Sequence, residues 1–214
     1  MMAFLSKHRV VWTRREFVVS VLLGLLILFL SLVLNYFAGT YASANASRPV
    51  NDIILDNLPV MNVDIIFIEG FVVFVIFVIG LLIYEPKSMP FVFKSLALFI
   101  VVRAFFMSLT HIGPFPEQSP LEPGPITGLL NFTGDLFFSG HTGAPFLMAL
   151  VFWSQKYIRI AFLCISALFA ATVLLGHWHY SIDVFAAFFI TYTLFHLARN
   201  FFKSDYKMLI EGVR

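Results

Sequence analysis

The stretch from Val63 to Tyr84 reads VDIIFIEGFVVFVIFVIGLLIY, and its hydropathy decides the class of fold. About 22 residues in an α-helix rise roughly 33 Å, close to the thickness of the hydrocarbon core of a bilayer. Lipid offers no hydrogen-bond partner to an open backbone, so a spanning segment of this kind must be helical. The stretch is therefore predicted to cross a membrane as a helix.

The composition of the whole chain points the same way. Of the 214 residues, 60% are hydrophobic and 12% are charged, whereas about a quarter of the residues are charged in an ordinary soluble domain. One water-soluble core of this size could not bury the 27 phenylalanines. No basic run occurs outside the termini, so nucleic acid is not expected as a partner. The single cysteine, Cys164, excludes an intramolecular disulfide.

Six apolar segments have spanning length, at about residues 17–37, 63–84, 91–110, 136–153, 158–176 and 180–200. We expect an all-α polytopic membrane protein in which residues 1–214 form a single domain of six transmembrane helices. Twelve of the 14 Lys and Arg residues lie near the termini or at alternate turns, and the exceptions are Arg48 and Arg103. By the positive-inside rule, both termini are predicted to be cytoplasmic.

Side chains that can carry chemistry converge at one predicted membrane depth. His141, His179, Asp183 and Arg103 fall within about 10 Å of the exoplasmic ends of their segments, which is the depth of a lipid phosphate. Polar groups inside spans are costly and suggest function. His179 and Asp183 are four residues apart, so the carboxylate can accept from one imidazole nitrogen and leave the other to attack phosphorus. His141 is the expected acid that protonates the departing oxygen.

The residues around His141 predict a seat for phosphate. Ser139, Gly140 and Thr142 open a predicted helix, whose first backbone N–H groups and positive dipole end favour anions. Arg103 could add a bidentate clamp on the transferring phosphoryl group.

Structural explanations compete with each of these interpretations. The small residues beside His141 could serve tight helix packing, and the pair His179 and Asp183 could only tie helices together. Arg103 could form a structural ion pair with Glu69 at a similar depth. The catalytic interpretation is favoured because two histidines, a carboxylate and an arginine meet in a chain that otherwise avoids charge there.

No metal or other cofactor is expected. A site built from His141, His177 and His179 lacks a repeated ligand spacing. On a helix His177 would point about 200° away from His179, so we expect His177 and Trp178 at the membrane interface. The sequence does not decide whether the sequons at Asn45 and Asn131 are used.

Two motifs resemble the membrane type 2 phosphatidic acid phosphatase (PAP2-like) superfamily, and within it the sphingomyelin synthase branch. They are GDLFFSGHT at residues 134–142 and HYSIDV at residues 179–184. Weaker similarity is found at Leu58-Pro59, Asp64, Arg103, Met107 and Thr110. The resemblance covers about residues 55–195 and implies six helices with an exoplasmic active site. It implies that His179 is the nucleophile that forms a phosphohistidine, that Asp183 orients it and that His141 is the acid.

The chain departs from the phosphatase branch of that superfamily. That branch carries Lys, six residues, then Arg-Pro, whereas Tyr41 stands in the Lys position before Arg48-Pro49 here. Phe138 replaces the Pro before Ser-Gly-His, and Val173 replaces an Arg six residues before the last histidine. These departures favour the synthase branch and leave Arg103 as the main candidate for binding phosphate.

The predicted function is therefore a lipid phosphotransferase. It would move a phospho-headgroup from a glycerophospholipid to a lipid alcohol such as ceramide or diacylglycerol. With water as the acceptor, the same site would be a lipid phosphatase or a phospholipase C-like hydrolase. A non-enzymatic lipid carrier or assembly subunit is the alternative of a different class, and a homo-oligomer is left open. The expected location is a bacterial inner membrane, or a Golgi or plasma membrane, with the site on the exoplasmic face.

Overall fold

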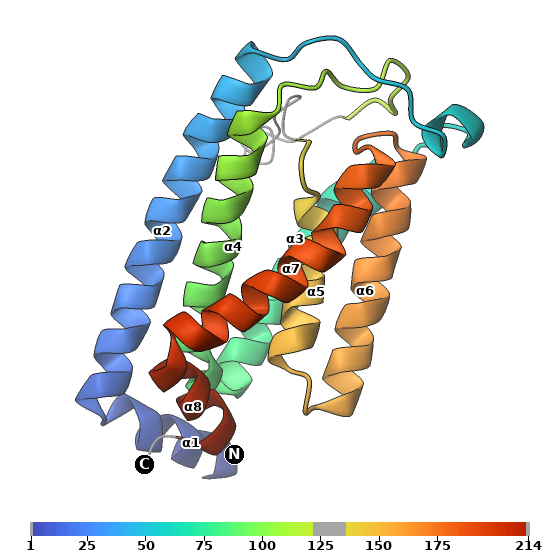
Figure 1. The fold of residues 1–214 in the computed structure, drawn as a ribbon. Helices are drawn as coiled ribbons and strands as arrows, with labels where there is room; N and C mark the ends of the chain where they lie inside the picture. The colour runs from blue at the N-terminus through green and yellow to red at the C-terminus, as the bar shows by residue number, and fades with distance from the viewer. Residues whose placement is uncertain (1, 122–135, 213–214) are drawn as a thin grey trace.

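The computed structural model describes residues 2–121 and 136–212, and this part of the chain is all-helical without strands (Figure 1). The elements are α1 (Met2–Trp12), α2 (Arg15–Ala44), η1 (Leu55–Asn57), α3 (Asp64–Tyr84), η2 (Pro86–Ser88), α4 (Met89–Leu109), α5 (Gly140–Val151), α6 (Lys156–Leu175), α7 (Ser181–Phe201) and α8 (Lys203–Glu211). The all-α prediction is confirmed for the described residues. The sequon at Asn131 and the first residues of the GDLFFSGHT motif lie outside them.

Five helices of the described chain are long and apolar enough to cross a membrane: α2, α3, α4 together with the preceding η2, α6 and α7. Their lipid-facing sides carry large apolar side chains, such as Leu22 on α2 and Val73 on α3, which are exposed. Exposed apolar surface on this scale is unfavourable in water. The length and composition of these helices indicate an integral membrane protein.

The fourth apolar segment differs from the sequence expectation. A span over residues 136–153 was predicted, whereas α5 has 12 residues and a length of about 18 Å. Ser139 is the N-cap of α5, and its side chain accepts from the backbone N–H of Thr142. The non-helical residues before it include Leu136, Phe138 and Ser139, which are buried. Irregular backbone at membrane depth is tolerated where protein covers it, and that covering makes a full-length helix unnecessary here.

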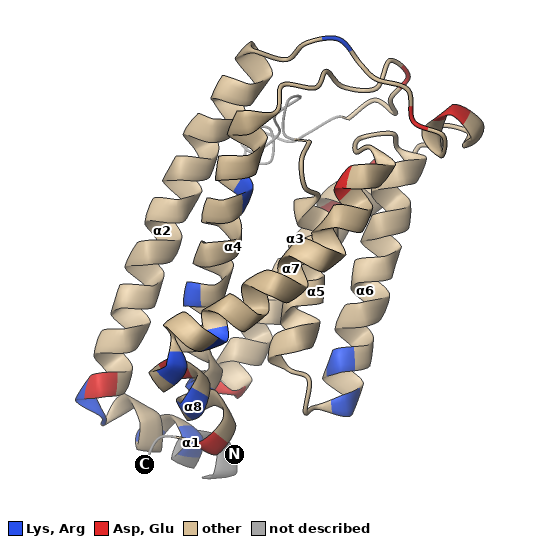
Figure 2. Cartoon of the chain, in the orientation of Figure 1, with Lys and Arg blue, Asp and Glu red and all other residues tan. Residues whose placement is uncertain are grey.

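The chain runs back and forth along one axis, and both termini lie at the same end of the molecule (Figure 1). Lys and Arg residues gather at this end (Figure 2). The small helices α1 and α8 also lie there, below the long helices. This distribution agrees with the charge pattern from which the orientation was predicted, and the assignment of this end to the cytoplasm stays a prediction.

The core lies mainly between α3, α4, α5, α6 and α7. Its fully buried side chains include Phe99, Met148, Phe162 and Phe169. In contrast, α2 packs mainly along α4, where Ala38 approaches Ala104 and Met107. Small residues at such contacts let two helix backbones approach closely. The well-packed half of the molecule is therefore the half that carries the two histidine motifs.

An ion pair fixes α8 at the end that holds the termini. Lys94 on α4 lies 2.6 Å from Asp205 on α8 and donates to the Ser20 hydroxyl on α2 at 2.7 Å. Both charged side chains are largely buried, at 12% and 6% exposure. Three elements that are distant in the sequence are thereby joined through one buried polar cluster.

Candidate active site

His179 and Asp183 meet at the start of α7. Asp183 Oδ2 accepts from the backbone N–H of Tyr180 at 2.9 Å and lies 3.4 Å from His179 Nδ1. His179 and Asp183 are 5% and 1% exposed. The imidazole contact is longer than a well-formed hydrogen bond, although catalytic hydrogen bonds are often long before substrate binds. One carboxylate thus caps the helix and faces the imidazole.

The local backbone differs from the one expected for this pair. Both residues were expected on one helix face, but Tyr180 is the N-cap of α7 and His179 therefore precedes the helix. The carboxylate reaches back from the third position of α7 toward the residue before the cap. The pair forms because an acidic residue in the first helical turn satisfies free backbone N–H groups. Helical capping therefore positions Asp183, and its spacing from His179 follows from the cap.

His177 and Trp178 are not placed at an exposed interface, which corrects the sequence expectation. His177 has a positive φ of 56°, and its Nε2 contacts the carbonyl oxygen of Leu58 at 3.0 Å. The Trp178 indole N–H donates to the carbonyl oxygen of Ser119 at 3.0 Å. Both side chains are buried. The left-handed backbone conformation of His177 turns the chain between α6 and α7. The contacts with the carbonyl oxygens of Leu58 and Ser119 hold His177 and Trp178 against neighbouring loops.

His141, the second residue of α5, lies among aromatic rings from α3 and α6. Its ring stacks on Phe67 with centroids 3.9 Å apart, and Phe71 lies 4.4 Å away. Phe169 approaches its edge at 5.7 Å. His141 is also within electrostatic range of His179 and Arg103. The structure therefore brings His141 to the same region as His179, Asp183 and Arg103.

Sequence reasoning did not single out Phe67, Phe71 and Phe169. Their contacts with His141 join α3 and α6 to α5, which are separate segments of the chain. Among 27 phenylalanines, no spacing distinguishes these three, whose rings lie against His141.

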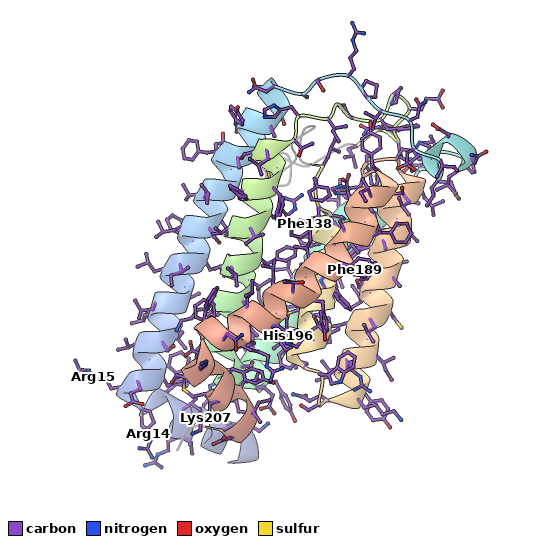
Figure 3. All side chains as sticks on the ribbon, in the orientation of Figure 1. Arg14, Arg15, Phe138, Phe189, His196 and Lys207 are labelled. Carbon is purple, nitrogen blue, oxygen red and sulfur yellow. The ribbon has the colours of Figure 1, made fainter. Side chains whose placement is uncertain are left out.

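Arg103 on α4 lies against the beginning of α5. It is buried, and its Nε donates to the carbonyl oxygen of Phe138 at 2.8 Å. Figure 3 shows Phe138 between α4 and α7, where its ring lies 5.3 Å from that of Phe99. A Cβ atom on Gly140 would lie 3.2 Å from Arg103 Nε, so glycine leaves the room that the guanidinium occupies.

Glu69, the alternative partner considered for Arg103, points elsewhere. It is exposed, and the helical repeat turns it about 160° from Phe71, whose ring packs on His141. The structure therefore places Glu69 on the outer face of α3, away from the site.

Ser139 joins the beginnings of α5 and α7. Its backbone N–H donates to the carbonyl oxygen of Asp183 at 3.1 Å, and its hydroxyl accepts from the Thr142 backbone N–H at 3.4 Å and hydroxyl at 3.2 Å. Within the described part of the chain, no residue accepts from the backbone N–H of Gly140 or His141. These two N–H groups lie at the N-terminus of α5 beside Arg103, which is the arrangement that binds anions at helix N-termini.

The packing interpretation of the small residues applies to Gly143. A Cβ atom there would lie 2.7 Å from the ring of Phe99 and 2.8 Å from the Thr191 hydroxyl. Gly143 is therefore needed for close contact of α5 with α4 and α7. Gly143 therefore serves helix packing, whereas Gly140 lies against Arg103.

The fold and the site together define a class: an all-helical membrane protein in which two histidines, an aspartate and an arginine lie near the ends of the helices. Among residues 2–121 and 136–212, no group of three or more His, Cys, Asp or Glu side chains could hold a metal ion. Imidazoles, a carboxylate, a guanidinium and free backbone N–H groups are suited to nucleophilic and acid–base chemistry at phosphorus.

A comparison with known families matches one part of the chain. The family described as PAP2 superfamily C-terminal matches residues 133–200, which is less than half of the chain and contains both His141 and His179. The match supports the PAP2-like superfamily, whose members are generally phosphatases or phosphotransferases, and so supports enzyme status. No curated protein and no solved structure matches the chain.

Proposed function

We propose that this protein is a lipid phosphotransferase of the sphingomyelin synthase kind. It moves a phospho-headgroup from a glycerophospholipid to a lipid alcohol such as ceramide. The observation that carries the proposal is the double role of Asp183, whose Oδ2 accepts from Tyr180 N–H and lies 3.4 Å from His179 Nδ1. A carboxylate on Nδ1 leaves Nε2 of the neutral imidazole unprotonated and nucleophilic.

The first step transfers the phosphoryl group to the enzyme. His179 Nε2 attacks phosphorus, the bond from phosphorus to the diacylglycerol oxygen breaks, and His141, which the bound phosphate anion keeps protonated, gives its proton to that oxygen. The products are diacylglycerol and a phosphohistidine that retains the headgroup. Arg103 and the backbone N–H groups of Gly140 and His141 neutralise the charge that develops on the phosphoryl oxygens.

The second step reverses the roles. Neutral His141 accepts the proton of the acceptor hydroxyl as that oxygen attacks phosphorus, and the bond between phosphorus and His179 Nε2 breaks. His141 is then protonated again and His179 is neutral, so the cycle closes. Water can replace the lipid alcohol in this step, and the protein would then be a hydrolase.

Product analysis separates the transferase from the hydrolase. Purified protein receives a glycerophospholipid with a labelled headgroup phosphate, with and without ceramide or diacylglycerol. We expect label in a new lipid only when the acceptor is present. Water-soluble labelled headgroup or phosphate as the only product in every sample would contradict the transferase and support the hydrolase.

A variant of the nucleophile separates enzyme from lipid carrier. His179→Gln keeps a polar side chain of similar size but has no nucleophilic ring nitrogen. We expect this variant to fold and to form neither labelled histidine nor labelled lipid product. Full turnover in the variant would contradict the assignment of His179. A wild-type protein that binds lipid without ever forming product would favour the carrier.

A further inference from the structure

The loop between α2 and α3 holds a buried carboxylate that the proposed mechanism does not use. Asp52 is 7% exposed. Its Oδ2 accepts from the backbone N–H of Ser181 at 2.7 Å. Its Oδ1 accepts from the backbone N–H groups of Ile54 at 2.9 Å and Leu55 at 3.2 Å. Three hydrogen bonds on one buried side chain form a built site that joins this loop to the start of α7.

The electrostatics of Asp52 agree with its geometry. Burial raises the pKa of a carboxyl group, but the hydrogen bonds from Ser181, Leu55 and Ile54 outweigh burial and hold the pKa of Asp52 below its ordinary value. The side chain is therefore charged at neutral pH. A charge-assisted hydrogen bond to a backbone N–H at a helix start is stronger than a neutral one.

Tyr180, the residue directly after His179, is held by the same loop and by the segment that follows α4. Its hydroxyl donates to the carbonyl oxygen of Gly113 at 2.9 Å and accepts from the Val50 backbone N–H at 3.2 Å. Its backbone N–H donates to Asp183. Two carboxylates from distant segments thus bind the successive backbone N–H groups of Tyr180 and Ser181.

The two helix starts at the site are therefore unlike. The start of α7 is occupied by Asp183 and Asp52, whose negative charge disfavours a phosphate there. At the start of α5, the backbone N–H groups of Gly140 and His141 have no acceptor among the described residues, and Gly140 lies against Arg103. A phosphate is attracted to α5, and α7 presents the nucleophile.

We infer that Asp52 is a positioning residue for His179. It fixes the backbone two residues after the nucleophile and so holds the imidazole against Asp183 and toward the start of α5. The inference rests on the proposed function, because it assigns His179 as the nucleophile. A displacement of about 1 Å at a reacting group can slow a reaction by about 100-fold, so loss of this anchor acts on the chemical step.

The experiment compares Asp52→Ala and Asp52→Asn with a matched control, Asp56→Ala. Asp56 is exposed and lies four residues further along the same loop. Asn has the shape of Asp but offers only one acceptor oxygen, so either Ser181 or the pair Ile54 and Leu55 loses its partner. Folding is checked by size-exclusion profile and thermal stability. The rate of phosphohistidine formation and the KM for lipid are then measured in each protein.

A second readout does not depend on activity. Diethyl pyrocarbonate modifies accessible imidazoles, and mass spectrometry gives the rate of modification at His179. We expect both Asp52 variants to form phosphohistidine at least about tenfold more slowly with little change in KM. We also expect His179 to react with diethyl pyrocarbonate faster than in wild type, while Asp56→Ala matches wild type in both measurements.

The outcomes separate the inference from the function on which it rests. Folded Asp52 variants with wild-type labelling and modification rates would overturn the positioning role. Loss of folded protein in both variants would also overturn it, because Asp52 would then serve folding alone. A wild-type protein that never gains label would contradict the proposed function, and the modification rate at His179 would still decide whether Asp52 positions that ring.

Discussion

The imidazole of His179 lies against a carboxylate, Asp183, that also accepts a hydrogen bond from the backbone at the start of α7. Asp183 caps α7 through the N–H of Tyr180 and contacts Nδ1 of His179 with the same oxygen atom. The geometry of the pair is thereby tied to the helix start. Because Asp183 is 1% exposed, water does not compete for this contact.

Asp183→Asn tests this dependence. The amide retains one oxygen for Tyr180 N–H, but it cannot stabilise the positive charge of an imidazolium or select the neutral tautomer as a carboxylate does. We expect phosphohistidine formation to fall by about 10²- to 10⁴-fold with the folded state retained. Single-turnover labelling measures the effect. Labelling at the wild-type rate would show that Asp183 serves only as a helix cap.

Gly140→Ala tests the contact between α5 and Arg103. The new Cβ atom would lie 3.2 Å from Arg103 Nε, so the guanidinium must move. We expect kcat/KM to fall at least about tenfold, measured with saturating acceptor and varied phospholipid. Gly80→Ala is the matched control, because a Cβ atom there meets nothing within 4 Å. Equal activity of the two variants would argue against a role of Arg103 in phosphate binding.

At the scale of elements, α8 is held by a buried ion pair rather than by apolar packing alone. Removing one partner of such a pair leaves an uncompensated buried charge, which is more damaging than replacing both partners. The pair of Lys94 and Asp205 is largely buried, whereas Lys207 and Glu211 form a more exposed pair at 4.0 Å. One pair joins α4 to α8 and the other lies within α8, so the two provide an internal comparison.

Lys94→Ala is expected to destabilise the protein by about 3–5 kcal/mol, because Asp205 stays buried without its cation. Lys207→Ala is expected to change stability by less than about 0.5 kcal/mol. Thermal unfolding in detergent measures both. A double variant, Lys94→Met with Asp205→Leu, should recover much of the loss. Similar destabilisation in the two single variants would contradict the assignment of α8 docking to the buried pair.

At the scale of the whole molecule, the site and the termini lie toward opposite ends. Lys and Arg gather at the end with the termini (Figure 2), and the loop that carries Asp52 lies at the other end (Figure 1). If the positive-inside rule holds for this chain, lipid phosphate reaches the site from the exoplasmic leaflet.

Labelling of single cysteines in intact cells or sealed vesicles tests this orientation. Cys164 is first replaced by Ser, because it is exposed. A membrane-impermeant thiol reagent applied from outside should modify Asp56→Cys and leave Lys203→Cys unmodified. Permeabilising the membrane should make both react. The reverse pattern would place the site on the cytoplasmic face without affecting the proposed chemistry.

The sequence anticipated some helices more closely than others. Residues 63–84 were expected to span, and α3 covers Asp64–Tyr84. In contrast, α2 continues to Ala44 beyond the apolar run that was expected to end at residue 37. The extension includes Ala38 and Ala42, which are buried. Hydropathy reports contact with lipid, so it does not register a helix that continues because small residues pack against a neighbour.

The sequence by itself determined the membrane class, the apolar segments and the two histidine motifs, because hydropathy, charge and spacing are properties of the local chain. Only the tertiary structure decided that α5 is short, that His177 is buried and that three phenylalanine rings surround His141. The hydrogen bond from Ser181 to Asp52 joins residues 129 positions apart. Contacts of this range arise when separate segments pack together, and no periodicity in the sequence records them.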